Sequence, residues 1–467
     1  MVEIDWISVL EAIPPNAREP DVEKWFVKYL INSLGFNEEE YCQQFSTVDS
    51  GIADFAMRKN SHYDKFCISR SNPYVFIEVK GQATVSNSGV ISNINLSEGT
   101  PQYKRTVAQV KRYLLSEKGK ASQWGIITNS IHIQLFRRHG KVVIPATPCE
   151  LIKKDNINKI IARIKKLIDN PPKALTVCVY NDKGGVGKTT TTINLAAVLW
   201  KKQKKVLVID FDPQQRDLTD SLGLTEGNVT LSECLINDKH DIKDTIKTYT
   251  IKDKSKPEKI FFDVIPSDHG LRELSSVTSI NLAQVVGGTR RLKDLLQAFI
   301  YEYDYILIDS PPGWSFFTQS SMYAADVVLM PTKHDNFSSL KNVVKVIKEI
   351  IPETQSARLK YDGEPLPIPL PIFFNEHNYT PASIVRTHQE IKKLIGIQTG
   401  EKIFADQALL PYYFPKASKD NFDTAIFSIP AYKVVASAAF SRLPASIQNK
   451  TALEYYIALA KEYFLHE

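Results

Sequence analysis

A glycine-rich turn near the middle of the chain constrains its fold more than any other feature. Residues 175–180 form an apolar run typical of a buried strand, and the turn at 182–187 leads directly into a predicted helix at 188–199. Three glycines allow the backbone to wrap around a phosphate with its N–H groups inward: Gly184, Gly185 and Gly187. The N-terminus of the helix adds partial positive charge. We therefore expect Lys188 to reach the β- and γ-phosphates of a nucleotide and Thr189 to offer its hydroxyl group to Mg²⁺.

The chain has 467 residues, which exceeds one compact core and predicts more than one domain. Residues 155–168 have apolar positions at helical spacing, and Asn170-Pro171-Pro172 ends that helix because proline lacks an N–H donor. We place a boundary there, between a first domain at 1–170 and a second at 171–467. In the second domain, predicted strands and helices alternate after residue 174, which indicates an α/β fold with a mostly parallel sheet covered on both faces. The first domain is predicted to be α+β, with a helix at 21–34, strands at 74–79, 124–129 and 131–137, and a loop at 81–99.

Several motifs after residue 174 resemble those of one ATPase family. The general P-loop pattern requires glycine where Asp182 stands, and Lys183 follows it instead. The run KGGVGKTT at 183–190 resembles the deviant P-loop of ParA/MinD-type ATPases. Later matches to that family are VLVIDFDPQ at 206–214, YDYILIDSPPG at 303–313, AADVVLMP at 324–331 and FFN at 373–375. The resemblance covers 174–467 and implies an α/β P-loop NTPase that binds ATP and Mg²⁺.

The same resemblance implies roles for individual side chains. Nucleotide contacts fall on eight consecutive residues: Lys183, Gly184, Gly185, Val186, Gly187, Lys188, Thr189 and Thr190. Lys183 would cross to the nucleotide of a second subunit in an ATP-bound dimer, and Asp212 would position the attacking water. Asp309, together with Asp210, would hold Mg²⁺. Asn375 has two interpretations, a contact with adenine or a buried structural asparagine.

The first domain contains acids and a lysine in a pattern suited to phosphodiester hydrolysis. Asp54 lies in GIADFAMR, and Glu78 and Lys80 lie in YVFIEVKGQ, where strand alternation places both on one face. Asp54 and Glu78 are hard oxygen ligands for a metal ion, and Lys80 would orient or activate the attacking water. Glu23, on the first helix, is an additional candidate ligand. A solvated salt bridge at a strand edge is the other interpretation of Glu78 and Lys80.

This arrangement resembles the PD-(D/E)xK nuclease domain of the restriction subunit of type I restriction enzymes, which implies a restriction-endonuclease-like fold. The resemblance covers about residues 18–140 and includes the GIAD run at 51–54, IEVK at 77–80 and WGIITNSIHIQLFRR at 124–138. Gln109 and Tyr113 lie one helical turn apart on one face, and the resemblance adds Gln109 to the candidate catalytic residues. Ala53 stands where the class name has proline, and no helicase motor is evident. The implied metal is Mg²⁺, with Mn²⁺ as a substitute.

The charge of the chain is concentrated in the first domain. Residues 1–170 contain 23 Lys plus Arg and 18 Asp plus Glu, a difference of +5 out of the total of +6. A polyanion such as DNA fits this excess, and so does an ordinary solvated surface. The candidate phosphate contacts are Lys104, Arg105, Lys111, Arg112, Arg137, Arg138 and Lys141, with Arg290 and Arg291 in the second domain.

These patterns predict an ATP-regulated, metal-dependent DNA nuclease, in which ATP-driven dimerisation controls DNA binding and cleavage in defence against foreign DNA. The alternative is a partition or positioning ATPase whose N-terminal domain is an idle docking module for DNA or protein. In a third interpretation, the ATPase holds the nuclease silent until a partner protein encoded with it arrives. We expect a cytoplasmic protein, because no signal peptide is evident and no apolar run approaches the length of a membrane span. Five dispersed cysteines without a CxxC pair argue against a disulfide framework or a zinc site.

Overall fold

The computed structural model describes residues 4–85, 89–251, 259–277, 279–377, 380–399, 402–417 and 423–466. The chain divides into two compact units. Unit 1 consists of residues 1–172 with two short later segments, 361–365 and 464–467, and unit 2 consists of residues 173–360 and 366–463. Within the described residues, no helix is both long enough and apolar enough to span a bilayer.

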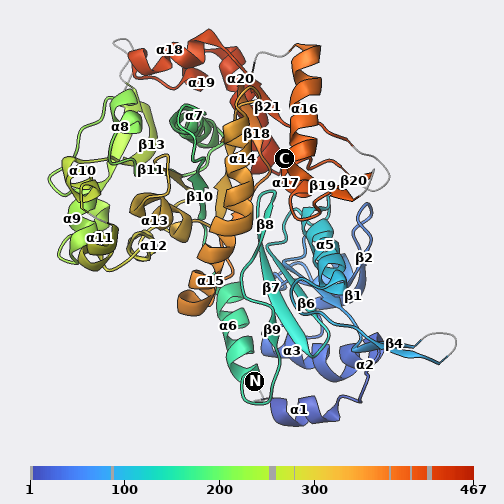
Figure 1. Cartoon of the computed structure of the whole chain (residues 1–467). Coiled ribbons are helices and arrows are strands. Elements are labelled where there is room, and N and C mark those ends of the chain that lie inside the picture. Colours follow the sequence, from blue (N-terminus) through green and yellow to red (C-terminus); the bar gives the residue numbers. More distant parts are fainter. Residues whose placement is uncertain are drawn as a thin grey trace. The chain divides into compact units, whose positions relative to one another are not determined.

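Unit 1 is built on a mixed sheet with the strand order β1-β2-β3-β6-β7-β8, in which β9 also pairs with β7 (Figure 1). Its strands are β1 (Tyr41–Ser46), β2 (Ile52–Met57), β3 (Val75–Val79), β6 (Trp124–Thr128), β7 (His132–His139), β8 (Val142–Pro145) and β9 (Glu150–Leu151). Neighbours are antiparallel except for β3 and β6. These two strands are parallel because helix α5 (Pro101–Leu115) returns the chain across the sheet between them.

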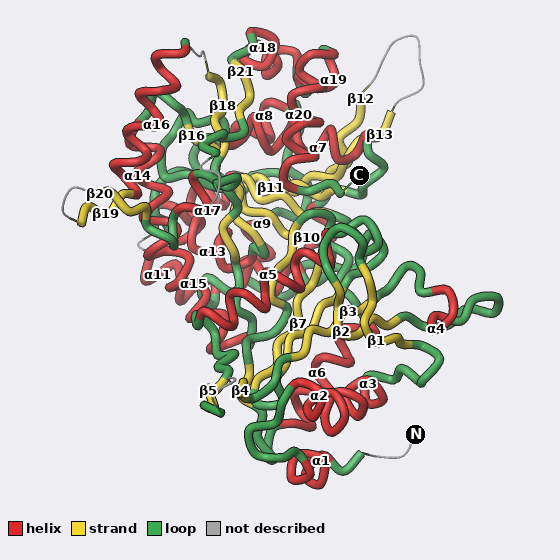
Figure 2. Tube along the Cα trace, turned by 90° about the vertical axis from the view of Figure 1, so that its right-hand side faces the viewer, coloured by secondary structure: helices red, strands yellow, loops and turns green. Residues whose placement is uncertain are grey.

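Two apolar clusters cover the opposite faces of this sheet. One cluster packs α1 (Trp6–Ala12), α3 (Lys28–Ser33) and α6 (Ile157–Asp169) against Ile77 and Val79 of β3. The other cluster packs α5 against Phe76. In Figure 2, α5 and the pair α3 and α6 lie on opposite sides of the strands. The alternation along β3 therefore places Glu78 on the same face as Phe76, under α5.

The helical segment predicted at 21–34 consists of three consecutive elements. These are α2 (Glu19–Val22), the π-helical turn η1 (Glu23–Val27) and α3. The start of α2 is set by proline in the first turn and by Oδ2 of Asp21, which accepts a hydrogen bond from Arg18 N at 3.1 Å. π-helical turns are rare and frequently occur at functional sites, and this one begins at Glu23.

The segment predicted as a loop at 81–99 contains a short hairpin, formed by β4 (Ala83–Val85) and β5 (Ile91–Asn93). Another short helix, α4 (Phe66–Ser69), follows β2. The expectation of an irregular segment is therefore wrong for the residues of β4 and β5.

Unit 2 has a seven-stranded sheet with the order β12-β13-β11-β14-β10-β15-β17. Its strands are β10 (Leu175–Val179), β11 (Val206–Asp210), β12 (Lys247–Ile251), β13 (Lys259–Ile265), β14 (Tyr305–Asp309), β15 (Val327–Leu329) and β17 (Ile368–Pro369). All pairs are parallel except that of β12 with β13. The prediction of a mostly parallel α/β sheet is therefore confirmed.

Smaller sheets and helices complete unit 2. Strands β16 (Pro331–Thr332), β18 (Phe373–His377) and β21 (Ser428–Pro430) form one small sheet, and β19 (Gly396–Thr399) pairs with β20 (Lys402–Ala405). The helices are α7 (Lys188–Lys201), α8 (Asp217–Ser221), α9 (Leu231–Ile236), η2 (Ile242–Thr245), α10 (His269–Ser275), α11 (Ser279–Val286), α12 (Arg291–Leu296), α13 (Phe316–Ala324), α14 (Phe337–Lys345), η3 (Val346–Ile350), α15 (Ile351–Asp362), α16 (Pro381–Ile395), α17 (Leu410–Tyr413), α18 (Lys433–Ser441), α19 (Ala445–Gln448) and α20 (Lys450–Tyr463).

Helix α7 is buried along most of its length, because it packs against the strands on one side and against α19 and α20 on the other. Separate apolar clusters join the sheet to α9–α13 and to the group α14, η3, α16 and α17. The glycine-rich turn thus leads from a central strand into a central helix.

Candidate functional site

The glycine-rich turn of unit 2 joins β10 to α7 where the parallel strands end. Gly185 and Gly187 have φ values of 74° and 85°, which glycine adopts without a steric cost. Gly187 is also the N-cap of α7, and a Cβ built there would lie 2.0 Å from Nδ2 of Asn375. Asn181 braces the turn, since its Oδ1 accepts a hydrogen bond from Lys183 N at 3.0 Å and its Nδ2 donates to a carbonyl of β16.

Lys188 lies at the start of α7, with its ammonium group inside the turn. Nζ donates to the Asn181 carbonyl at 3.2 Å, and the residue is 8% exposed. Burial lowers the pKa of Lys188, while the charges of Asp309 and Asp212 oppose this effect. A buried ammonium group beside inward-facing backbone suits a phosphate ligand. Lys183, in contrast, is exposed.

The carboxylates of Asp210 and Asp309 lie at the ends of neighbouring strands. The register of β11 and β14 pairs these two residues. Asp309 is 2% exposed, and burial followed by repulsion from Asp210 raises its pKa to about 8. A hydrogen bond from Thr189 acts in the opposite direction. The predicted Mg²⁺ ligands Thr189 and Asp309 therefore lie side by side.

Local hydrogen bonds orient the other two aspartates of this site. Oδ2 of Asp210 accepts from the hydroxyl group of Thr219 at 2.6 Å and from its backbone N–H at 2.9 Å. Burial nevertheless raises the pKa of Asp210 to about 6. Its Oδ1 accepts from Asp212 N at 3.4 Å. Asp212 accepts a hydrogen bond from Gln214 N at 2.9 Å.

Asn375 on β18 is 1% exposed and is bound to the turn itself. Its Nδ2 donates to the Val186 carbonyl at 3.0 Å, which agrees with the structural interpretation of this asparagine. Two cavities, of about 240 Å³ and 450 Å³, lie beside the start of α7 and beside β18. The first is lined by Thr189 and Thr190, the second by Asn375, and both by Glu376 and Val435.

A second site lies in unit 1, where β2 and β3 are antiparallel. The register pairs Phe55 with Ile77, so Asp54 and Glu78 are the next residues on the two strands. Asp54 is 7% exposed and Glu78 is 2% exposed. Oδ2 of Asp54 accepts a hydrogen bond from Val79 N at 2.7 Å, and the Glu78 side chain lies within hydrogen-bonding reach of the same carboxyl group. The fold thus brings the two predicted acids together.

Lys80 joins these acids directly. Its Nζ lies 2.5 Å from Oε1 of Glu78 and 3.8 Å from Oε2 of Glu19. Oε2 of Glu78 is buried without a well-aligned hydrogen bond from the described residues, although Asp54 and Tyr113 lie within hydrogen-bonding reach of the Glu78 carboxyl group. Burial, followed by repulsion from Asp54, raises the pKa of Glu78 to about 7. Burial, the largest single effect, lowers the pKa of Lys80, but the charge and hydrogen bond of Glu78 together with the charges of Glu19 and Asp54 outweigh burial, and the net effect is a raised pKa.

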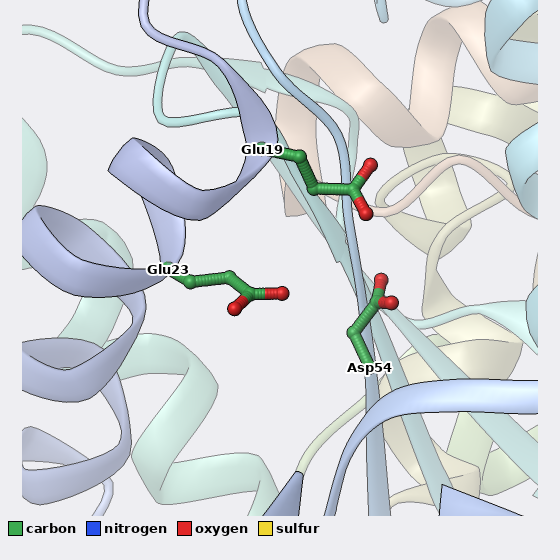
Figure 3. Close-up of side chains that lie close together, drawn as sticks. All are labelled: Glu19, Glu23 and Asp54. Carbon is green, nitrogen blue, oxygen red and sulfur yellow. The ribbon is translucent and has the colours of Figure 1, made fainter. Parts of the chain in front are cut away.

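Glu19, Glu23 and Asp54 form a cluster of carboxylates whose oxygen atoms all lie within 4.8 Å of one another (Figure 3). Glu19 opens α2 and Glu23 opens η1 four residues later, so both side chains point from one side of the helix toward β2. Burial is the main cause of the raised pKa of each glutamate, and the charge of Asp54 adds to it.

Gly81 explains why the helix approaches the strands so closely. A Cβ on Gly81 would lie 3.0 Å from the backbone nitrogen of Glu19, and Gln82 N donates to the Ala17 carbonyl at 2.7 Å. Sequence reasoning included Glu23 and missed Glu19. The available signal was the four-residue spacing between Glu23 and Glu19, which lies just before the helix predicted at 21–34.

Helix α5 borders the Glu78 side of this site. The hydroxyl group of Tyr113 donates to the Ile52 carbonyl at 2.9 Å. Burial and the nearby Glu78 carboxylate raise the pKa of Tyr113. Gln109 lies one turn earlier on α5 and is half-buried, whereas Ala53 packs in the apolar cluster beneath the helix.

Two predicted phosphate contacts are wrong because their side chains are buried. Arg137 is 4% exposed and Arg138 is 7% exposed. Arg138 donates to the carbonyls of Gly119, Lys120 and Ser122, at 2.6, 2.9 and 3.2 Å, and so stabilises the loop after α5. The exposed candidates in unit 1 are Lys104, Arg105, Arg112 and Lys141, and Lys111 is half-buried.

The two arginine candidates in unit 2 have local partners. Arg290 forms an ion pair with Asp294 at 3.2 Å, and Arg291 forms one with Asp238 at 2.5 Å. Arg291 also donates to the Cys234 carbonyl at 2.6 Å, so it caps the chain after α9.

The donor set in unit 1 suits a divalent metal ion. Carboxylate oxygens are the ligands that Mg²⁺ and Mn²⁺ prefer in proteins. A buried carboxylate oxygen without a partner is costly, and a cation would satisfy Oε2 of Glu78. The residues present therefore fit such an ion.

Known proteins resemble the part of the chain that begins at residue 174, which matches a family described as "AAA domain" over residues 174–360. The chromosome partitioning protein ParA of Myxococcus xanthus is 33% identical over 181 residues, which are 37% of this chain and 59% of that protein. The sporulation initiation inhibitor protein Soj of Bacillus subtilis is 34% identical over 181 residues, which are 37% of this chain and 66% of that protein.

A solved structure of the septum site-determining protein MinD of Pyrococcus horikoshii, complexed with Mg-ADP, is also similar to this chain. The two sequences are 22% identical, the TM-score is 0.41, and the match covers 62% of this chain and 95% of the MinD chain. The chain spans less than two thirds of the length of either curated relative. The family match, these identities and the glycine-rich turn before a buried helix agree with one another. Residues 174–360 therefore match the AAA domain family and are similar to the ParA and Soj proteins.

Proposed function

We propose that this protein is an ATP-regulated, metal-dependent DNA nuclease, with cleavage in unit 1 and control by ATP in unit 2. The convergence of Asp54, Glu78 and Lys80 carries the proposal. A buried pair of acids is costly for a fold: burial raises the pKa of Asp54, and burial followed by repulsion from Asp54 raises the pKa of Glu78. Phosphodiester hydrolysis uses these groups, since it needs acids for a metal ion and an ammonium group beside the phosphate.

Each side chain has a separate task in the proposed reaction. A cation held by Asp54 and Glu78 would polarise the phosphate and acidify a water molecule. Glu78 keeps the pKa of Lys80 raised, so Lys80 remains an ammonium group that orients the water and stabilises negative charge. The water oxygen bonds to phosphorus as the bond to the leaving oxygen breaks. The proton of the water passes to solvent, and the leaving oxygen takes up a proton from solvent.

The ATP-dependent part of the proposal rests on the ParA/MinD-type domain. We assign the nucleotide phosphates to residues 183–190, Mg²⁺ to Thr189 and Asp309, and the positioning of the hydrolytic water to Asp212. The exposed Lys183 would reach the nucleotide of a second subunit. ATP binding would then pair two chains on DNA, and hydrolysis would release them.

A supercoiled-plasmid assay tests the cleavage. The full chain with Mg²⁺ or Mn²⁺ is expected to nick or linearise the plasmid, and Asp54→Asn is expected to abolish this because the amide is a poor metal ligand. Lys80→Ala should also abolish it, whereas Lys120→Ala, which removes an exposed lysine paired with Glu117, should not. An absence of cutting by the unsubstituted chain in every nucleotide state, with ATP still hydrolysed, would refute the nuclease.

A second candidate function follows from the relatives named above. One is described as a chromosome partitioning protein, which favours a partition or positioning ATPase whose unit 1 docks on DNA or on a protein. Under this alternative, unit 1 variants would change localisation without changing DNA integrity. The cytoplasmic setting, a partner protein and a role in defence against foreign DNA belong to the first proposal and remain predictions.

A further inference from the structure

We propose that the hairpin of β4 and β5 (residues 83–85 and 89–93, here the arm) enters the major groove of duplex DNA and positions it for cleavage. The inference rests on the proposed nuclease function and adds the element that holds the substrate. Strand β4 begins at Ala83, three residues after Lys80, so the arm continues the strand that carries the proposed catalytic residues. Figure 1 shows β4 leaving unit 1 at its margin, and Figure 2 shows β5 beside it.

The arm is not covered by a larger sheet. Among the described strands, β4 and β5 pair only with each other. All three residues of β5 are exposed although side chains alternate along a strand, so both faces of β5 meet solvent. Val90 and Ile91 are 59% and 54% exposed. A lone two-stranded hairpin is marginally stable in water, and exposed apolar side chains on such an element favour a role in binding.

Hydrogen bonds fasten the base of the arm to unit 1. Gln82 N donates to the Ala17 carbonyl at 2.7 Å, and Ile94 N donates to the Gln82 carbonyl at 2.8 Å. Nε2 of Gln82 donates to Oγ of Ser130 at 3.0 Å, and Nδ2 of Asn129 donates to the Ile94 carbonyl at 3.0 Å. The base of the arm is therefore held at a fixed place relative to the proposed catalytic residues, as the positioning of a substrate requires.

The size of the arm fits the major groove. Paired strands lie about 4.7–4.9 Å apart, and a groove about 12 Å wide and about 8.5 Å deep admits a two-stranded ribbon. Lys80 and Thr84 are four residues apart, which is a reach of at most about 14 Å along the backbone. Since one base pair occupies about 3.4 Å, the arm would contact bases within about four base pairs of the phosphate that is cut.

The charges around the arm favour DNA over a protein partner. Residues 81–97 contain no charged side chain, so no acid on the arm repels phosphate. Helix α5 follows, and its sequence includes four cations and no acid. Thr100, the N-cap of α5, donates its hydroxyl group to the Asn95 carbonyl at 2.7 Å, which holds the start of α5 close to the base of the arm. The exposed Lys104 and Arg105 would then bind phosphates beside the groove.

The exposed side chains of the arm suit base edges. Thr84 lies opposite Ser92 in the register, and Asn93 follows on β5. Hydroxyl and amide groups form hydrogen bonds with base edges in the major groove, and Ile91 would contact the methyl group of thymine.

Binding of a labelled duplex, followed by fluorescence anisotropy in EDTA, tests the arm without cleavage. Ser92→Asp places a negative charge on the arm and should weaken binding by the full chain about tenfold or more. Thr84→Asp, on the paired strand, should have the same effect. Ala121→Asp makes an equal change of charge at an exposed position in the loop after α5 and should bind as the wild type does. In cleavage, Ser92→Asp should raise KM and leave kcat unchanged.

A second duplex of the same sequence identifies the groove. Its cytosines carry glucosylated 5-hydroxymethyl groups, which fill the major groove. The wild type should bind this duplex about tenfold more weakly, because base contacts are lost, and Ser92→Asp should reduce the difference. Equal binding of the wild type to both duplexes, or equal losses in Ser92→Asp and Ala121→Asp, would overturn the inference.

The plasmid assay separates this inference from the proposed function. If Ser92→Asp and Thr84→Asp bind DNA as the wild type does while the wild type cuts the plasmid, the arm has no role in binding and the nuclease stands. If binding depends on the arm but the wild type never cuts, the nuclease is refuted and the arm serves DNA docking alone.

Discussion

Replacing Glu78 by glutamine should make the metal-free protein more stable at alkaline pH. The pKa of Glu78 rises from 4.5 to about 7 because the side chain is buried beside Asp54. The difference of about 2.5, at about 1.4 kcal/mol for each pKa unit, means that ionising folded Glu78 costs about 3 kcal/mol more than ionising it in the unfolded chain. The variant amide avoids this cost and can still accept a hydrogen bond from Lys80.

The difference in stability between Glu78→Gln and the wild type depends on pH. Because the folded pKa is raised, the wild-type chain has its full stability below pH 4.5 and loses it as pH rises through about 7. Glu78→Gln should therefore match the wild type near pH 4.5 and exceed it by up to about 3 kcal/mol at pH 8 in the presence of EDTA. At about 2–4 °C for each kcal/mol, the melting temperature of a unit of this size should rise by about 6–12 °C.

A bound metal ion should make the wild type more stable than Glu78→Gln at pH 8. A cation at one thousand times its dissociation constant stabilises the wild type by about 4.1 kcal/mol, which exceeds the deficit of about 3 kcal/mol, and the variant should lose most of this gain. Scanning calorimetry of the full chain measures both effects, and hydrogen exchange of peptides from β2 and β3 assigns the transition to unit 1. If Glu78→Gln were less stable than the wild type at pH 8 without metal, Glu78 would be a structural partner of Lys80 and the argument for a metal site would fail.

Two further predictions concern residues whose geometry is constrained. Gly187→Ala places a Cβ 2.0 Å from Asn375 at a left-handed φ, which should cost at least about 1.4 kcal/mol and weaken ATP binding tenfold or more. Equal affinities of the variant and the wild type in a fluorescent-nucleotide titration would contradict this. Arg138→Ala removes three hydrogen bonds to carbonyls and should lower the free energy of unfolding by about 2–4 kcal/mol. Lys141→Ala, at an exposed position, should change the free energy of unfolding by less than about 0.5 kcal/mol. If Arg138→Ala lost DNA affinity without losing stability, Arg138 would be a DNA contact and not a structural residue.

The features predictable from sequence are those whose residues are contiguous. The turn at 183–190 carries its glycines, lysine and threonine in one run, so a strand, a loop and a helix could be assigned together. Asp54 and Glu78 lie 24 residues apart in sequence, yet strand alternation and the resemblance at 51–54 and 77–80 were enough to place them in one site. Glu19 could not be placed in this way, because its position depends on how closely Gly81 lets the backbone before α2 approach β3.

The wrong predictions have physical causes as well. Arg137 and Arg138 ended a predicted hairpin and looked exposed, but β7 lies inside the sheet and Arg138 bonds to a loop that no local pattern links to it. The hairpin of β4 and β5 lies in a segment rich in serine, asparagine and glycine, and all three residues of β5 are exposed. Since β5 contributes nothing to an apolar core, its sequence has no alternating pattern from which a strand could be predicted.

Both sites contain a pair of acids that weakens the fold when no cation is bound. In unit 1, Glu78 beside Asp54 has a pKa of about 7, and in unit 2, Asp309 beside Asp210 has a pKa of about 8. Each pair lies on neighbouring strands whose pairing holds the carboxylates together away from water. Neutral side chains of similar size would stabilise either sheet better, so structure alone does not account for these acids. Under the proposed function, cation binding would account for them, because a divalent cation would remove the repulsion between the carboxylates when it is bound. The stability of the ligand-free chain should therefore fall as pH rises through 7 and 8, and Mn²⁺ together with Mg-ATP should flatten that dependence; an unchanged slope would mean that neither acid pair meets a cation.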